Sequence, residues 1–189
     1  MDALLFALML GLLLDQGDRS QRLVHRLGDG AQDAKAGMIS LVCLIVIIGA
    51  VGSAILGLAI APYLAGRAGQ LFFAITLLFG AFGLVLSARS NEPATSAAPL
   101  PSGRLFGELL LYRLVDRSSF LLIGIVALTG NAWATALGGA IGGLGALLLP
   151  LIAGRQYERM LRLNRVRPAF GGVLLLASAG YALSALGLY

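Results

Sequence analysis

The chain has 189 residues, of which 58% are hydrophobic and 12% are charged, and its formal net charge is +5 at pH 7. Soluble globular domains carry about 25% charged residues, so this composition excludes an ordinary soluble domain. Several charge-free stretches reach the roughly 20 residues that a helix needs to cross the hydrocarbon core. Together with two charged segments, they predict an all-α membrane protein with six transmembrane helices. The predicted spans are 3–20, 38–61, 69–88, 105–128, 133–153 and 169–188.

The first span joins an apolar run to a cluster of charges. Residues 3–14 contain no charged side chain, and Asp15-Gln16-Gly17-Asp18-Arg19-Ser20 follows directly. Asp2 stands where a signal peptide carries basic residues, and no Ala-x-Ala-like cleavage site follows, so we expect a retained helix. A charge at the centre of a membrane helix costs about 2.5–3.5 kcal/mol, so such groups face the bundle interior or a water-filled cavity.

Small residues recur at four-residue spacing in the second and fifth predicted spans. This spacing lets helix backbones approach closely in lipid, so we expect tight helix packing from these positions. The residues are Gly49, Ser53 and Gly57 in one span, and Gly138, Gly139, Gly142 and Gly143 in the other.

A proline-containing polar stretch divides the chain into two similar halves. Residues 90–104 are predicted to form a cytoplasmic linker between a first three-helix repeat, 1–89, and a second, 105–189. Both halves contain Asp-Arg-Ser and, later, Pro-x-x-Ala-Gly-Arg, at 62–67 and 150–155. Because each half has an odd number of spans, the second half must be inverted relative to the first, as in many secondary transporters.

The basic residues outside the two charged segments lie almost entirely on one side of this topology. By the positive-inside rule, the three basic loops then face the cytoplasm and both termini face the periplasm of a bacterial inner membrane. Topology thus accounts for the net positive charge, and we expect no nucleic-acid partner. The ten residues on the cytoplasmic side are Arg22, Arg26, Lys35, Arg89, Arg104, Arg155, Arg159, Arg162, Arg165 and Arg167, and only Arg67 lies on the other side.

The first charged segment has the chemistry of a cation site. In a helix, Asp15 and Asp18 share a face, and Arg19 lies four residues from Asp15. Two converging carboxylates in a low-dielectric site can bind a cation, pair with an arginine or hold a proton. Their oxygen atoms suit hard ions such as Ca²⁺, Mg²⁺ or Mn²⁺. Gly17 could allow a local helix break that frees carbonyl groups for the ion.

The chain resembles the Golgi-type calcium/manganese–proton antiporters and their bacterial manganese-exporter relatives. That family carries Glu-x-Gly-Asp-[Lys/Arg]-[Ser/Thr] in the first helix of each of two repeats. The first motif here is matched by Asp15, Gly17, Asp18, Arg19 and Ser20, and the second by Asp116, Arg117 and Ser118 alone. The resemblance implies a six-helix secondary transporter and a cation site. It assigns transport and cation binding to Asp15, Gly17, Asp18, Ser20, Asp116 and Ser118, metal coordination to Asp15, Asp18 and Asp116, and charge pairing to Arg19 and Arg117. Spacing adds Arg113 to the charge-pairing residues.

The chain departs from the family pattern at three positions, and one of these changes the charge. Asp15 replaces a glutamate, and Arg113 stands where the second glutamate belongs, while Val115 replaces the second glycine. The family motifs carry four acids and two bases, a net of −2, whereas three acids and three bases give zero here. Arg113 can pair with Asp116 at i, i+3 and occupy the place of the cation.

The expected function is therefore that of a divalent cation (Mn²⁺ or Ca²⁺)/proton antiporter or exporter. A transporter of the same fold for another solute, and a transport-inactive scaffold or partner subunit, remain alternatives. An enzyme is not expected, because the sequence shows no nucleophile–base pair or nucleotide-binding loop. We expect no cofactor apart from the transported ion, and membrane lipid, protons and the cation as partners. Homo-oligomer formation is left open.

Overall fold

A computed structural model describes residues 2–15, 35–64, 66–87, 106–107, 110–111, 113–114, 116–153 and 163–188. Every regular element in these ranges is helical, which confirms the predicted all-α class for this part of the chain. The predicted linker, 90–104, lies outside the described residues. The elements are α1 (Asp2–Leu14), α3 (Lys35–Ile60), the 3₁₀ turn η2 (Ala61–Tyr63), α4 (Arg67–Ser87), α6 (Arg117–Thr129), α7 (Ala132–Ala153) and α9 (Leu163–Leu186).

Four of these helices, α3, α4, α7 and α9, are long and apolar enough to cross a membrane. Their outward faces carry large apolar side chains, such as Ile55, Phe79 and Leu176, which are 61%, 61% and 76% exposed. Soluble proteins seldom expose such a wide apolar surface, so these faces suit contact with lipid. The predicted membrane protein is therefore supported, with four spans of full length.

The remaining two helices, α1 and α6, are shorter than the predicted first and fourth spans. Each has 13 residues, which gives about 20 Å at 1.5 Å per residue, against about 30 Å for the hydrocarbon core. α1 ends at Leu14, directly before Asp15, and α6 begins at Arg117 rather than near residue 105. The expectation of one continuous helix over 105–128 is wrong, because Asp116 adopts an extended backbone conformation (φ −74°, ψ 156°) as the N-cap of α6.

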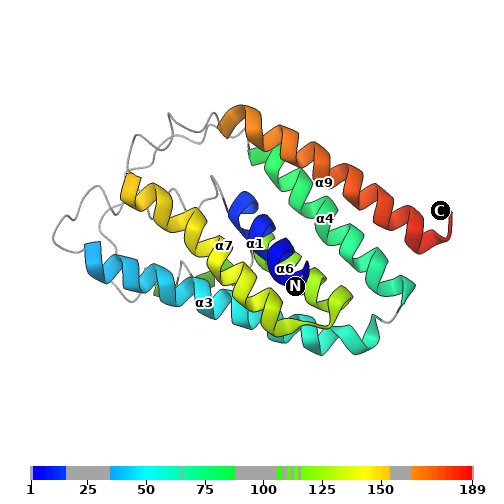
Figure 1. Cartoon of the computed structure of the whole chain (residues 1–189), viewed down its shortest axis with the longest axis horizontal. Coiled ribbons are helices and arrows are strands. Elements are labelled where there is room, and N and C mark those ends of the chain that lie inside the picture. The colour runs from blue at the N-terminus through cyan, green and yellow to red at the C-terminus, as the bar shows by residue number, and fades with distance from the viewer. Residues whose placement is uncertain are drawn as a thin grey trace.

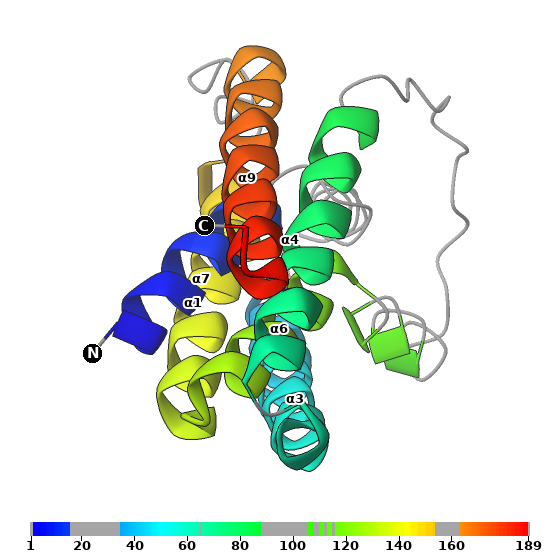
Figure 2. The same cartoon turned by 90° about the vertical axis from the view of Figure 1, so that its right-hand side faces the viewer.

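Packing between helices crosses the boundary between the predicted halves. α1 packs on α7, and α6 packs on α3, so the first helix of each half contacts the second helix of the other. α3 also packs on α7, and α4 on α9. In Figure 1 the short α1 and α6 lie near the centre of the view, with the paired α4 and α9 along one side. Figure 2 shows α4 and α9 side by side, facing the viewer, and α1 at one edge of the bundle.

The glycines of α7 bring α1 and α7 into backbone contact. A Cβ atom at Gly142 would lie 2.9 Å from the backbone nitrogen of Leu12, and one at Gly138 would lie 3.0 Å from Cβ of Ala7. No side chain can be added at these positions without moving the α1 backbone. The predicted close approach of helices at small residues is confirmed, and it places the end of α1 deep in the bundle.

Candidate functional site

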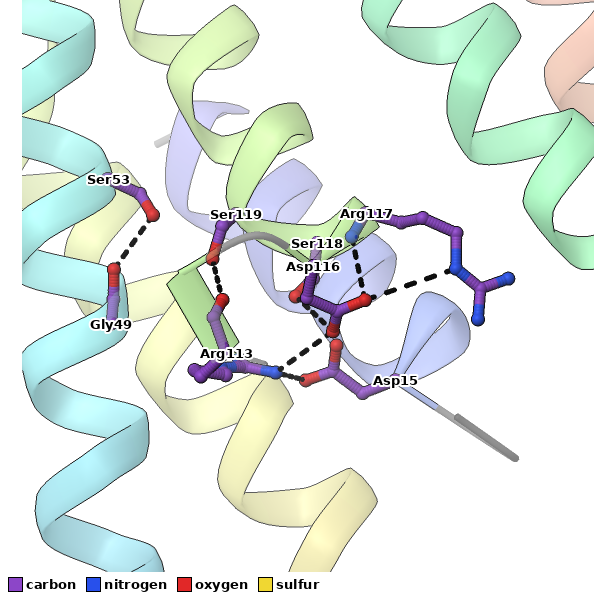
Figure 3. A network of polar contacts seen from close by, with 8 residues as sticks. All are labelled: Asp15, Gly49, Ser53, Arg113, Asp116, Arg117, Ser118 and Ser119. Carbon is purple, nitrogen blue, oxygen red and sulfur yellow. Dashed lines mark hydrogen bonds and ion pairs between the residues drawn. The ribbon is translucent and has the colours of Figure 1, made fainter. Parts of the chain in front are cut away.

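Asp15 lies at the inner end of α1 and is completely buried. Its side chain is 0% exposed, and its backbone nitrogen donates to the carbonyl oxygen of Gly11 at 3.3 Å. Nη1 of Arg113 donates to Oδ2 of Asp15 at 2.5 Å, forming an ion pair between residues 98 positions apart (Figure 3). The other carboxylate oxygen, Oδ1, is buried and accepts no hydrogen bond from any described residue.

Arg113 reaches Asp15 from the segment that precedes α6. It is 2% exposed and ranks among the largest fully buried side chains of the described residues. Its carbonyl oxygen accepts a hydrogen bond from Oγ of Ser119 at 2.5 Å, which fixes this segment against the first turn of α6 (Figure 3). An isolated charge in a low-dielectric interior is strongly unfavourable, so the buried guanidinium of Arg113 needs a charged partner in a fixed position. Asp15 is such a partner.

Asp116 combines a helix cap with a second contact to Arg113. Its Oδ1 accepts from the backbone nitrogen of Arg117 at 2.7 Å, and its Oδ2 accepts from Oγ of Ser118 at 3.2 Å. Nη1 of Arg113 lies 3.8 Å from the same Oδ2. Asp15 and Asp116 therefore flank one guanidinium nitrogen, with Arg113 held between the two carboxylates (Figure 3).

Arg117 points away from this pair, toward α4. Its Nε lies 4.0 Å from Oδ1 of Asp116, and its side chain is 21% exposed. A Cβ atom at Gly83 of α4 would overlap the Arg117 side chain, with Nε at 3.0 Å. The absence of a side chain at Gly83 thus makes room for Arg117 between α6 and α4.

Among the described residues, this cluster contains two acidic and two basic side chains. Asp15 and Asp116 carry two negative charges, and Arg113 and Arg117 carry two positive charges. Coulomb attraction is strong where water is excluded, but removing either partner of a buried pair leaves an uncompensated charge. The arrangement is therefore sensitive to single charge changes.

The structure brings together five of the nine residues that the sequence singled out. Asp15, Arg113, Asp116, Arg117 and Ser118 lie in one cluster. The predicted local Arg113–Asp116 contact is present at 3.8 Å, but the closer partner of Arg113 is Asp15. The remaining four, Gly17, Asp18, Arg19 and Ser20, lie outside the described residues.

Sequence reasoning did not assign to the site three residues that shape the space around Arg113, although it named the two glycines among them as helix-packing positions. These are Ser119, Gly49 of α3 and Gly143 of α7, which all contact or adjoin its side chain or backbone. One signal could have indicated the Asp15–Arg113 pair. Aligning the two motifs places Arg113 at the position that corresponds to Asp15, and residues at corresponding positions of an inverted repeat can meet near its two-fold axis.

The described side chains do not form a ready ligand set for a metal ion. No group of three or more His, Cys, Asp or Glu side chains gathers anywhere in the described ranges. Asp15 and Asp116 are the two carboxylates that converge, and Arg113 lies between them. A divalent ion needs about six oxygen ligands, so it could bind here only after the guanidinium had moved away.

Comparison of this chain with models of known protein families, with curated proteins and with solved structures gave no match.

Proposed function

We propose that this protein is a secondary transporter of the membrane, built from two inverted three-helix repeats, whose central site is the Asp15–Arg113–Asp116 cluster. The packing pattern supports the repeat, because α1 on α7 and α6 on α3 are corresponding contacts. Helices at the same position in the two halves also contact each other, as expected about a two-fold axis. These are the second helices, α3 and α7, and the third helices, α4 and α9.

One pair departs from this two-fold pattern in an informative way. α4 packs on α6, yet the corresponding pair, α9 and α1, makes at most a marginal contact among the described residues. Transporters built from inverted repeats hold their two halves in different conformations and exchange these conformations to open the site to either side. A protein trapped in one of these conformations would pack α4 on α6 more closely than α9 on α1, as observed here.

The depth of the cluster supports a role in transport. Helices of 13 residues extend about 20 Å, so the inner ends of α1 and α6 lie within the hydrocarbon core if their outer ends lie near its surface. Transporter sites form where membrane helices are interrupted in this way. Charged residues within membrane segments mark ion pathways and proton relays.

The carboxylates favour exchange of a cation for protons. Asp15, fully buried with Oδ1 unbonded among the described residues, carries this proposal, because such an oxygen can accept a proton or a cation. Mn²⁺ and Ca²⁺ are the cargo that the resemblance favours, and oxygen ligands suit both ions. The ion would displace the guanidinium of Arg113 from the two carboxylates.

The position of Arg113 also favours a second candidate. A guanidinium 2.5 Å from Asp15 neutralises the site without any added ion, as expected of a transport-inactive partner subunit. The remaining alternative is transport of an anionic solute. In that case, protonation of Asp15 would release the Arg113 guanidinium, which could then bind the anion.

Transport by purified protein in liposomes distinguishes these candidates. We expect the wild-type protein to take up Mn²⁺ or Ca²⁺ under an imposed proton gradient, and Asp15→Asn to lose most of that uptake. Asp2→Asn, a change at an exposed aspartate on the same helix, is the matched control and should transport like the wild type. Absence of uptake of either ion by the wild type would reject the cation antiporter and favour the inactive or anion-linked protein.

We further propose that both termini face the periplasm. Tyr63 and Trp133 are 86% and 83% exposed, near the α3–α4 connection and the α6–α7 turn, at the end of the molecule that also carries the C-terminus (Figure 1). Exposed tyrosine and tryptophan are typical of membrane–water interfaces. Arg67 lies at this end too, beside Gly187, and the other ten loop arginines and lysines are assigned to the opposite face.

Cysteine labelling in intact cells tests this orientation. An impermeant thiol reagent should label Leu188→Cys at the C-terminal end and should not label Ser96→Cys in the predicted linker, in a Cys43→Ser background. Permeabilised cells should show labelling of both. Labelling of Ser96→Cys from outside would invert the proposed orientation.

A further inference from the structure

The Arg113 side chain fills a cradle to which both halves of the chain contribute. Asp15 and Asp116 supply the negative charge, at 2.5 and 3.8 Å from Nη1. Gly49 of α3 and Gly143 of α7 supply the space. A Cβ atom at Gly49 would lie 2.6 Å from Cγ of Arg113, and one at Gly143 would lie 2.5 Å from Nη2.

The shape of the cradle distinguishes the two ends of the arginine. Gly49 borders the aliphatic stem, whereas Gly143 borders both the guanidinium and the carboxylate that binds it, since its Cβ would lie 3.1 Å from Oδ2 of Asp15. A side chain at Gly143 would therefore reach into the contact between the two charges. The charged end of the cradle is a space of guanidinium size, walled by a glycine and by two carboxylates.

The bonding of Asp15 shows that the cradle has acceptor capacity beyond what Arg113 uses. A carboxylate and a guanidinium commonly pair through two parallel hydrogen bonds. Here Oδ2 of Asp15 is bonded, whereas Oδ1 is buried and accepts no hydrogen bond from the described residues. An ion pair with only a structural role would be expected to satisfy both oxygens, because an unpaired buried acceptor costs stability.

We infer that Arg113 is a tethered occupant of a cation site, and that the ligand class of this site is a small planar guanidinium-type cation. The side chain competes with a diffusible guanidinium-type cation, and with the transported ion, for Asp15 and Asp116. It thereby regulates the site, which is open to a transported ion only while the guanidinium is displaced. This regulatory role rests on the proposed transport function, but occupancy of the cradle by Arg113 does not.

Removing the tether should uncover the site for a free guanidinium ion. The Arg113→Ala variant keeps Asp15, Asp116 and both glycines, and it deletes the guanidinium and its stem. A diffusible guanidinium ion can then supply the missing charge to Asp15 from the same position. Ligands that bind only the native state raise the stability by mass action, so binding is readable without a transport assay.

The experiment measures thermal unfolding of the full-length protein, purified in detergent, during titration with guanidinium chloride at low millimolar concentration. We expect the midpoint of Arg113→Ala to rise saturably, by about 3–6 °C at ten times the dissociation constant. Urea has the planar shape of guanidinium but no charge, and the sodium ion of sodium chloride has the charge but not the shape. Neither compound should raise the unfolding midpoint of Arg113→Ala.

Two controls locate the effect. The wild type, whose cradle is filled, and Asp15→Asn/Arg113→Ala, whose cradle lacks its main charge, should not respond. Equal responses in all three proteins, or an equal response to sodium chloride, would overturn the inference. If Arg113→Ala does not fold, Arg113→Gln takes its place. The glutamine side chain is shorter and neutral, so it leaves the guanidinium space empty. If Arg113→Gln does not respond to guanidinium, the inference is also overturned.

This outcome is independent of the transport result. A guanidinium response in a protein that transports neither Mn²⁺ nor Ca²⁺ would reject the proposed function and leave the tethered occupant in place. Cation transport by the wild type, with no guanidinium response in Arg113→Ala, would support the proposed function and reject the tethered occupant.

Discussion

Replacing Asp15 with alanine is expected to lower the free energy of unfolding by about 3–5 kcal/mol. The change removes the carboxylate that binds Arg113 at 2.5 Å, and the Arg113 side chain is 2% exposed. Asp116, at 3.8 Å, is too far from Nη1 to replace the lost hydrogen bond in the present geometry. The buried guanidinium then loses its closest counter-charge and the short hydrogen bond to it, which is the main source of the loss.

A double-mutant cycle separates the ion pair from simple packing. Arg113→Met keeps the volume of the stem and removes the charge, so Asp15→Ala/Arg113→Met contains neither member of the pair. We expect its loss of stability to be about 1–3 kcal/mol smaller than the sum of the two single losses. Thermal or denaturant-induced unfolding of the purified protein provides the measurement. Asp2→Ala, at an exposed position of α1, should cost less than about 1 kcal/mol. Additive losses would show that Asp15 and Arg113 do not interact as described.

Replacing Arg113 with glutamate is expected to make stability depend on divalent ions. The described part of the cluster changes from two acids and two bases, a net of zero, to three acids and one base, a net of −2. The introduced carboxylate would face Asp15 across a buried contact, and like charges at that separation need a shared proton or a metal ion. Without added metal, the loss of stability should equal or exceed that of Asp15→Ala. Saturating Mn²⁺ or Ca²⁺ should restore about 2.7 kcal/mol at 100 times the dissociation constant.

The same variant tests whether Arg113 helps or hinders transport. If Arg113 occupies the place of the ion, Arg113→Glu should create or strengthen Mn²⁺ or Ca²⁺ uptake into liposomes under a proton gradient. Arg113→Gln is the matched control, because it removes the positive charge without adding a carboxylate and should gain little metal dependence. Strong uptake by the wild type that is abolished by Arg113→Glu would show that the arginine is a working part of the transport cycle.

Hydrophobicity alone predicted the long helices closely. The spans expected at 38–61, 69–88 and 133–153 correspond to α3 (Lys35–Ile60), α4 (Arg67–Ser87) and α7 (Ala132–Ala153). The bounds agree because charged residues and turn residues limit these segments on both sides. The tight packing was also predictable, since four-residue spacing of glycines has one geometric meaning on a helix surface.

The start of α6 could have been predicted from a local signal that hydrophobicity obscures. Asp116 precedes Arg117-Ser118-Ser119, and aspartate is a preferred N-cap because its carboxylate accepts from the free backbone nitrogens of the first turn. An apolar stretch on both sides suggested continuity instead. The cap bond at 2.7 Å breaks that continuity and turns the Asp116 carboxylate toward Arg113.

The Asp15–Arg113 pair was not predicted from the sequence because the two residues are far apart in the chain. Local spacing rules compare residues three or four positions apart, and they favoured Arg113 with Asp116. The closer partner lies 98 residues away and depends on how α1 and α6 meet within the bundle. Only the three-dimensional packing, including the space left by Gly49 and Gly143, decides which carboxylate receives the guanidinium.

The opposite charges of Asp15 and Arg113 have a consequence for how such a chain can evolve. In the proposed inverted repeat, Asp15 and Arg113 occupy corresponding positions, and residues that meet on a two-fold axis would be identical if the two segments were identical. The neutral contact at 2.5 Å on such an axis therefore needs two unlike segments. A dimer of two copies of residues 105–189 about the same axis would bring two Arg113 side chains together. A reversal of either charge is then acceptable only if its partner reverses too, so these two positions are expected to change together among descendants of this chain.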